Sequence, residues 1–206
     1  MNCIDLIDSI ARRQLEVIKS QASLQEILTP NYGWENHRYK NHLFRQAHVE
    51  IFKQDKFGVV HCCVFPNYTD PSPIYGFDVI SSEHKITGVF LDLSPVVTPV
   101  LPFLDLEVTK ERNRPEWGDI FSEHWLAARP SYDELAVIGD AAVDLLVRYL
   151  NTLGNKGPID KIISAQNHYC NQQQKNPHTR RALQNLIGSE KTEEFMTQIL
   201  FPCVDS

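Results

Sequence analysis

Two ionisable side chains interrupt stretches that are otherwise apolar and strand-like. His61 lies in residues 59–65, in which the other residues are apolar apart from two cysteines. Asp78 lies in residues 74–81. An imidazole and a carboxylate on neighbouring strands are costly to remove from water unless they are paired or used in chemistry. We therefore interpret them as the working pair of an active site, able to hold and move a proton. Structural alternatives stay open here: His61 as a buried histidine bonded to a carbonyl, and Asp78 as a turn cap near Gly76.

The neighbouring elements predict how this pair is held. Residues 85–93 form a third predicted strand, and short segments rich in proline, serine or acidic residues separate the three strands. Before them, alternating apolar residues suggest a hairpin that turns at residues 53–56 and leads into the strand of His61. This hairpin places Glu50 beside His61, so that Glu50, His61 and Asp78 lie on adjacent strands of one sheet. Taken alone, Glu50 reads as an ordinary strand-edge carboxylate.

Helical patterns flank this run of strands. Residues 3–20 carry apolar side chains at helical spacing, and we expect residues 24–28 to extend this helix towards Pro30. The C-terminal part predicts helices over residues 132–151, 159–174, 177–188 and 192–200. This order predicts an α+β fold, an antiparallel sheet covered by helices, in one domain over residues 1–206.

The segment between the third strand and the C-terminal helices is irregular. We expect a proline-rich covering loop with a charged tip at residues 110–114, a helical turn within residues 115–124 and a strand around residues 125–128. Asp92, at the end of the third strand, is expected to bond backbone amides there.

Composition excludes several classes of protein. The 206-residue chain has a formal net charge of −6, which argues against a general nucleic-acid binder. No hydrophobic run is long enough to cross a bilayer, and acidic residues stand where an export signal needs positive charge. Five cysteines without CxxC spacing favour reduced thiols. We expect a cytoplasmic protein that binds neither nucleic acid nor membrane.

Common cofactor and metal motifs are absent from the sequence. It contains no GxGxxG, P-loop, HExxH or GxSxG pattern. Eight histidines raise the question of metal binding, but no pair has clear ligand spacing. We place His37, His42 and His48 on a surface stretch and expect no metal site.

Longer motifs point to a known family. The pattern HCxxFP followed by GxD, with QQQKN downstream, resembles the ferredoxin-dependent bilin reductases. The resembling blocks are residues 44–50 (FRQAHVE), 61–66 (HCCVFP), 74–80 (IYGFDVI), 91–95 (LDLSP), 115–123 (PEWGDIFSE), 168–181 (HYCNQQQKNPHTRR) and 195–201 (FMTQILF). Together they cover most of the chain from Phe44 onward.

The resemblance implies both a fold and a reaction. The fold is a three-layer α/β/α sandwich with a central antiparallel sheet, and the substrate, biliverdin IXα, lies between the sheet and the C-terminal helices. The reaction is reduction to phycocyanobilin by single electrons, through bilin radicals. The donor is an external [2Fe–2S] ferredoxin, and no flavin, haem or metal is bound. We expect a monomer.

The resemblance also assigns roles to individual residues. Asp78 matches the family's central proton-supplying aspartate, His61 matches its histidine partner, and Glu50 matches the glutamate that protonates the D-ring vinyl side. The implied substrate-binding residues are Arg112 for a propionate, Asn176 in the pocket lining, His178 where a relative has lysine, and Thr87. Acidic ferredoxin would need a basic patch, for which the candidates are Lys110, Arg112, Arg114, Lys175, Arg180 and Arg181.

Two other functions are considered. One is a four-electron reduction of biliverdin to phycoerythrobilin, as in relatives found in phage. Glu50 favours phycocyanobilin, because a resembling phycoerythrobilin-forming group has aspartate there. The other is a non-catalytic bilin-binding protein, against which the set of Glu50, His61 and Asp78 argues.

Overall fold

A seven-stranded antiparallel sheet forms the centre of the protein. The computed structural model describes residues 2–106, 108, 111–116 and 118–204. The sheet runs in the order β1-β2-β3-β4-β5-β6-β7, so every strand pairs with its neighbour in sequence. The strands are β1 Gln25–Glu26, β2 Glu35–Lys40, β3 Phe44–Gln54, β4 Phe57–Pro66, β5 Ile74–Ser82, β6 Ile86–Ser94 and β7 Leu126–Ala128. The three predicted strands and the hairpin before them are confirmed.

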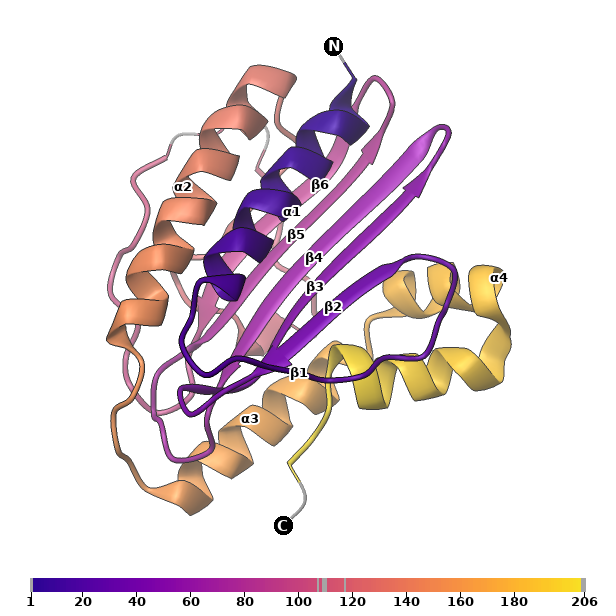
Figure 1. Cartoon of the computed structure of the whole chain (residues 1–206). Helices are drawn as coiled ribbons and strands as arrows, with labels where there is room; N and C mark the ends of the chain where they lie inside the picture. The colour runs from indigo at the N-terminus through magenta and orange to yellow at the C-terminus, as the bar shows by residue number, and fades with distance from the viewer. Residues whose placement is uncertain (1, 107, 109–110, 117, 205–206) are drawn as a thin grey trace.

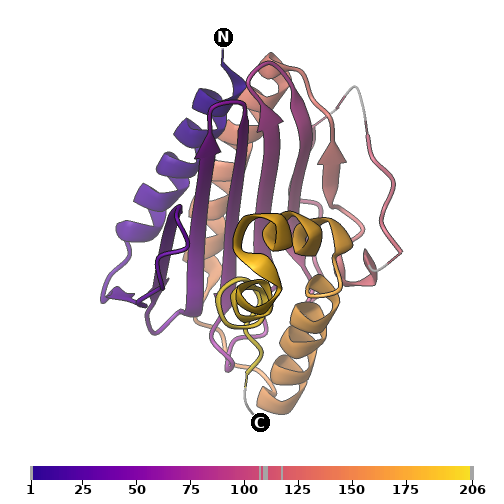
Figure 2. The ribbon, with the colours of Figure 1, turned by 90° about the vertical axis from the view of Figure 1, so that its right-hand side faces the viewer.

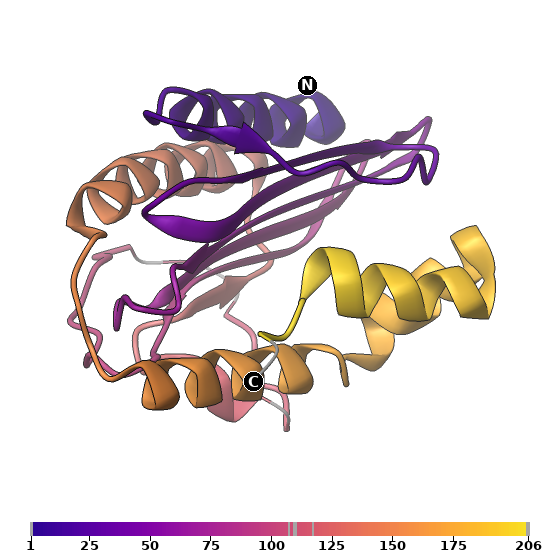
Figure 3. The ribbon, with the colours of Figure 1, turned by 60° about the horizontal axis from the view of Figure 1, so that its bottom comes forward.

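Helices cover both faces of the sheet. Helices α1 (Cys3–Lys19) and α2 (Tyr132–Thr152) lie on one face, while α3 (Ile159–Gln173) and α4 (Pro177–Glu194) lie on the other (Figures 1 and 3). Figure 2 shows α3 and α4 in front of the strands, with α1 and α2 behind them. This arrangement confirms the predicted α+β class and its three layers.

The alternation of side chains sorts each strand between the two layers. In β3, Ala47, Val49 and Ile51 belong to the core that includes α1 and α2. Because successive side chains point to opposite faces, His48 and Glu50 face α3 and α4. The strand pattern therefore produces an apolar face beneath the first pair of helices and a face with ionisable groups beneath the second.

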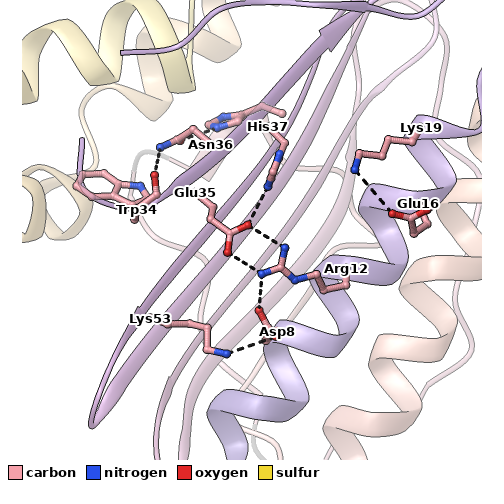
Figure 4. Close-up of polar contacts among 10 residues, drawn as sticks. Asp8, Arg12, Glu16, Lys19, Trp34, Glu35, Asn36, His37 and Lys53 are labelled. Atoms are coloured by element: carbon pink, nitrogen blue, oxygen red, sulfur yellow. Dashed lines mark hydrogen bonds and ion pairs between the residues drawn. The ribbon is translucent and has the colours of Figure 1, made fainter. Parts of the chain in front are cut away.

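The N-terminal helix ends earlier than expected. Residues 24–28 do not extend α1, because the chain turns after Ser20, with Ser23 at a φ of 55°, and enters β1. Arg12 of α1 donates to both carboxylate oxygens of Glu35 on β2, at 2.6 and 2.8 Å (Figure 4). This pair fastens the helix to the sheet edge, where a longer helix would have displaced β1.

The C-terminal helices follow the predicted boundaries with one change. Ser131 and Glu134 form a capping box that starts α2, the helix predicted from residue 132. Gly188 was expected to end the helix that begins at Pro177, but it forms a kink instead, with φ at 78°. Helical structure resumes, reaches Glu194 and passes into the π-helix η2 (Phe195–Leu200). Glycine permits this positive φ without a Cβ clash.

In the irregular segment the predicted helical turn and the strand after it are confirmed, while residue 110 of the predicted charged tip lies outside the described residues. A 3₁₀ turn, η1 (Gly118–Ile120), precedes β7, and Glu111 forms an isolated bridge with Ala128. Within the described ranges, no helix is long and apolar enough to cross a membrane.

Candidate active site

Glu50, His61 and Asp78 form one row across three strands. Glu50 on β3 is paired in register with His61 on β4, which is paired with Asp78 on β5. Directly paired residues share a face, so all three side chains project towards α3 and α4. The Nδ1 atom of His61 lies 2.7 Å from Oδ1 of Asp78. The structure therefore brings together the three residues that the sequence predicted as catalytic.

This row lies at the floor of a cavity that is lined by residues of the sheet and of the C-terminal helices. The cavity has a volume of about 500 Å³, within the usual range for small-molecule sites. All seven predicted site residues line it: Glu50, His61, Asp78, Thr87, Arg112, Asn176 and His178. Its apolar walls come from both layers, with Phe90 on the sheet, Leu183 and Leu186 on α4, and Phe121 near η1. An elongated, largely apolar ligand with a few polar groups suits such a space.

Glu50 is the buried carboxylic acid of this row. The residue is only 7% exposed, and burial raises the pKa of its carboxyl to about 7. The positive charge of His61 opposes this shift, and the negative charge of Asp78 adds to it. Glu50 can therefore carry a proton at neutral pH and release it there.

His61 and Asp78 have unequal access to solvent. The side chain of His61 is 7% exposed, whereas that of Asp78 is 42% exposed. Burial alone would lower the pKa of His61, but the charge and hydrogen bond of Asp78, together with the charge of Glu50, raise it overall. Nε2 of His61 is buried and has no hydrogen-bond partner among the described residues. The ring is thus held at one nitrogen and available at the other.

Sequence reasoning missed His48, which was expected on the surface. It is fully buried on β3, its Nε2 lies 2.9 Å from Oδ1 of Asn36, and its ring centroid lies 5.5 Å from that of His61. Burial, followed by the charge of His61, lowers the pKa of His48 well below its usual value. The missed signal was the two-residue spacing from Glu50, which puts both side chains on one face.

Arg112 is held at the rim of the cavity by its backbone and its aromatic neighbour. Its backbone N–H donates to the carbonyl of Ala127 at 2.8 Å, and its guanidinium lies 5.0 Å from the centroid of the Phe90 ring. Burial lowers its pKa from the usual value, which for arginine still leaves it charged. The cation faces a cavity in which an anionic group would be stabilised.

The other predicted substrate-binding residues also make contacts within the protein. Asn176 caps α4, its Oδ1 accepting from the backbone N–H groups of His178 and Thr179, which leaves its NH₂ group for a ligand. The hydroxyl of Thr87 donates to the carbonyl of Ile80 at 3.0 Å. His178 is exposed in the first turn of α4, where the helix dipole favours negative charge.

Asp92 joins the end of β6 to the segment that contains Ser122. It is buried and accepts from the hydroxyls of Ser94 and Ser122 at 2.6 Å each, and from the backbone N–H of Ser122 at 3.1 Å. A further backbone hydrogen bond, from Leu93, meets the expectation of bonding at the strand end. The Ser122 contacts fasten β6 to the segment carrying Phe121 and Trp125, whose rings stack at 5.2 Å.

The basic groups considered for docking differ in their surroundings. Lys110 lies outside the described residues. Arg114 donates to the carbonyl of Ser122 and packs on Trp125, whereas Arg180 forms an ion pair with Glu193. Among the described residues, no group of three or more histidine, cysteine or acidic side chains could hold a metal ion.

Comparisons with known proteins agree with this geometry. A sequence profile of the ferredoxin-dependent bilin reductases matches residues 6–202. The phycocyanobilin:ferredoxin oxidoreductase of Trichodesmium erythraeum is 32% identical over 185 residues, which cover 81% of this chain and 75% of that protein. The solved structure of a protein called PcyX superposes with a TM-score of 0.71 at 28% identity, over 97% of this chain and 99% of that one.

A more distant structure shares the fold. Tomato phytochromobilin synthase, solved in complex with biliverdin, has a TM-score of 0.73 at 15% identity, covering 94% of this chain and 82% of that one. At this identity the likeness concerns the architecture.

Proposed function

The chain belongs to the ferredoxin-dependent bilin reductase family of oxidoreductases, and on that premise we propose that it reduces biliverdin IXα to phycocyanobilin. The reduction takes four electrons and four protons, and the electrons arrive one at a time from a [2Fe–2S] ferredoxin. Relatives that carry the name phycocyanobilin:ferredoxin oxidoreductase support this choice of product.

The row of Glu50, His61 and Asp78 carries the proposal. One electron added to a conjugated tetrapyrrole makes a basic radical, and water would protonate it without choosing an atom. Acids fixed along one edge of the substrate set the position that gains hydrogen. A hydrogen-bonded His61–Asp78 pair next to a buried acid provides such fixed donors.

Each member of the row has a separate part in this proposal. Asp78, the most open of the three, contacts the central pyrrole nitrogens and supplies a proton. His61 donates from Nδ1 to Asp78, shares that proton with it, and presents Nε2 to the bilin. Glu50, protonated near neutral pH, delivers a proton to the D-ring vinyl side.

The propionates of the bilin face the opposite rim. Arg112 binds one propionate through its guanidinium, which can form two parallel hydrogen bonds with a carboxylate. His178 and the NH₂ group of Asn176, at the start of α4, receive the other, helped by the helix dipole. Thr87 packs against the bilin beside Ile80, since its hydroxyl already has a carbonyl partner.

The electron donor binds this enzyme from outside. We propose that ferredoxin docks near the basic groups Arg112, Arg114, Lys175 and Arg181, where local charge complements an acidic partner despite the net negative charge of the chain. The enzyme acts as a cytoplasmic monomer.

An anaerobic turnover assay tests the function. The protein is mixed with biliverdin, ferredoxin and a ferredoxin-reducing system, and the product is identified by absorbance and chromatography. Phycocyanobilin supports the proposal. Phycoerythrobilin would retain the reaction and overturn the product, whereas a spectral shift without reduction would indicate a bilin carrier.

A further inference from the structure

Arg38 is a buried arginine whose hydrogen bonds end on uncharged groups. It lies on β2, is 7% exposed, and donates to Oε1 of Gln46 at 2.8 and 3.3 Å and to the carbonyl of Gln198 at 3.0 Å. Arginine remains charged when buried, and a buried cation that bonds only neutral acceptors is costly. A cost of this kind is most often retained at functional sites.

The neighbour of this cation is His48. Arg38 and His48 are paired in register, so their side chains lie on the same face of the sheet. His48 lies between Arg38 on one side and His61 on the other, and its Nδ1 has no partner among the described residues. A positive charge at this place opposes protonation of His48.

Other ionisable groups also surround His48. They are His61 and Cys63 on β4, Arg38 and His37 on β2, and Glu50 two residues along β3. After burial, the charges of His61, Arg38 and His37 act in that order to lower the pKa of His48. Arg38 is the one permanent cation among them.

The same arginine holds a segment of the cavity wall. Arg38 bonds the carbonyl of Gln198, and Gln46 bonds the next carbonyl, that of Ile199, at 2.9 Å. Both carbonyls belong to the π-helix η2, a type of turn that is frequent at functional sites. The chain then reaches Phe201, whose ring stands edge-on to His61 at 5.9 Å and lines the cavity.

We propose that Arg38 is a positioning residue for the reaction: its charge keeps His48 neutral, so that the proton shared with Asp78 stays on His61. With Gln46 it also fixes the turn that seats Phe201 against His61. This assignment rests on the proposed function, because it concerns the proton supply of the same site. It names a residue outside the cavity lining that acts through His48 and Phe201.

Imidazole NMR on the substrate-free protein tests the charge effect. Labelled histidine signals are followed from about pH 8 down to the lowest pH at which the protein stays folded, because the pKa of His48 lies well below the usual imidazole value. Arg38→Gln removes the charge and retains a donor for Gln198, so the His48 midpoint should rise by about one unit, the order of shift that a nearby unit charge produces. Arg38→Lys should leave the midpoint near that of the wild type.

Arg148→Met provides the matched control, because this exposed arginine on α2 carries the same charge change. A His48 shift in Arg38→Gln no larger than in this control would overturn the proposal. If Arg38→Gln fails to fold, Arg38→Met is measured in its place, with far-UV circular dichroism as the folding check.

The acid limb of kcat/KM should move up with the His48 midpoint, and an unmoved limb in an active variant would also overturn the proposal. Absence of bilin reduction by the wild-type protein would overturn the proposed function instead.

Discussion

Replacing Glu50 with glutamine should change the pH dependence of stability in a defined way. Burial moves the pKa of this carboxyl from 4.5 to about 7 in the folded protein. The folded state therefore holds the proton more tightly, and the stability this contributes is fully present below about pH 4.5. It is lost as the pH rises through about 7. A shift of about 2.5 units corresponds to about 3 kcal/mol.

Glutamine has a similar shape and no charge to desolvate. The unfolding free energy of Glu50→Gln minus that of the wild type should therefore increase by about 3 kcal/mol between about pH 4.5 and about pH 8.5. The measurement is urea unfolding of the substrate-free protein at both pH values, followed by circular dichroism. Comparing the two pH values cancels any pH-independent effect of the amide on packing.

The exposed residue Glu26 on β1 offers a control. Glu26→Gln should change the unfolding free energy by the same small amount at both pH values. An equal effect of Glu50→Gln at the two pH values, or a larger gain at low pH, would show that Glu50 is not held in its protonated form by burial. The proton-donor role given to it would then lose its physical basis.

Three further predictions concern the reaction and the fold around it. Asp78→Asn should bind biliverdin but lower kcat by at least about 100-fold, because a fixed proton donor is lost. Anaerobic stopped-flow absorbance should show a partly reduced bilin, and normal turnover would refute the role of Asp78 as proton donor. Arg112→Gln should raise the Kd for biliverdin about tenfold through loss of a charge-assisted hydrogen bond. Biliverdin dimethyl ester should bind the variant and the wild type with equal affinity. An equal loss of affinity for biliverdin and for its ester would contradict a propionate contact. Turnover with ferredoxin should slow as salt is raised from about 0.05 to about 0.5 M, and a rate independent of ionic strength would exclude docking through basic groups.

Local patterns were sufficient to predict most of the fold. The helix over residues 132–151 and the apolar strands that contain His61 and Asp78 depend on neighbours within a few residues, and the structure confirms them. Predictions failed where distant segments compete. Residues 24–28 have helical spacing, but Gln25 and Glu26 pair with β2 and form β1 instead. Gly188 breaks helical geometry without ending the helix.

The row of site residues was predictable for the same reason. A strand places every second side chain on one face, and a tight hairpin sets the register. The turn lies at residues 55–56, so Gln54 pairs with Phe57 and Glu50 with His61. A turn centred on residues 53–56, as predicted, would have put Glu50 opposite Val59, on the same face as His61 but two residues away. Their catalytic roles stay predictions.

The sequence by itself determined strands β3 to β6 and the placing of Glu50, His61 and Asp78 on adjacent strands, because these follow from local periodicity and short turns. Only the tertiary structure decided which of these groups lose contact with water. Glu50 and His48 are buried by their packing between layers, and Arg38 finds Gln198, 160 residues away, only after the chain has folded. Desolvation depends on what packs above a side chain, and no local pattern contains that information.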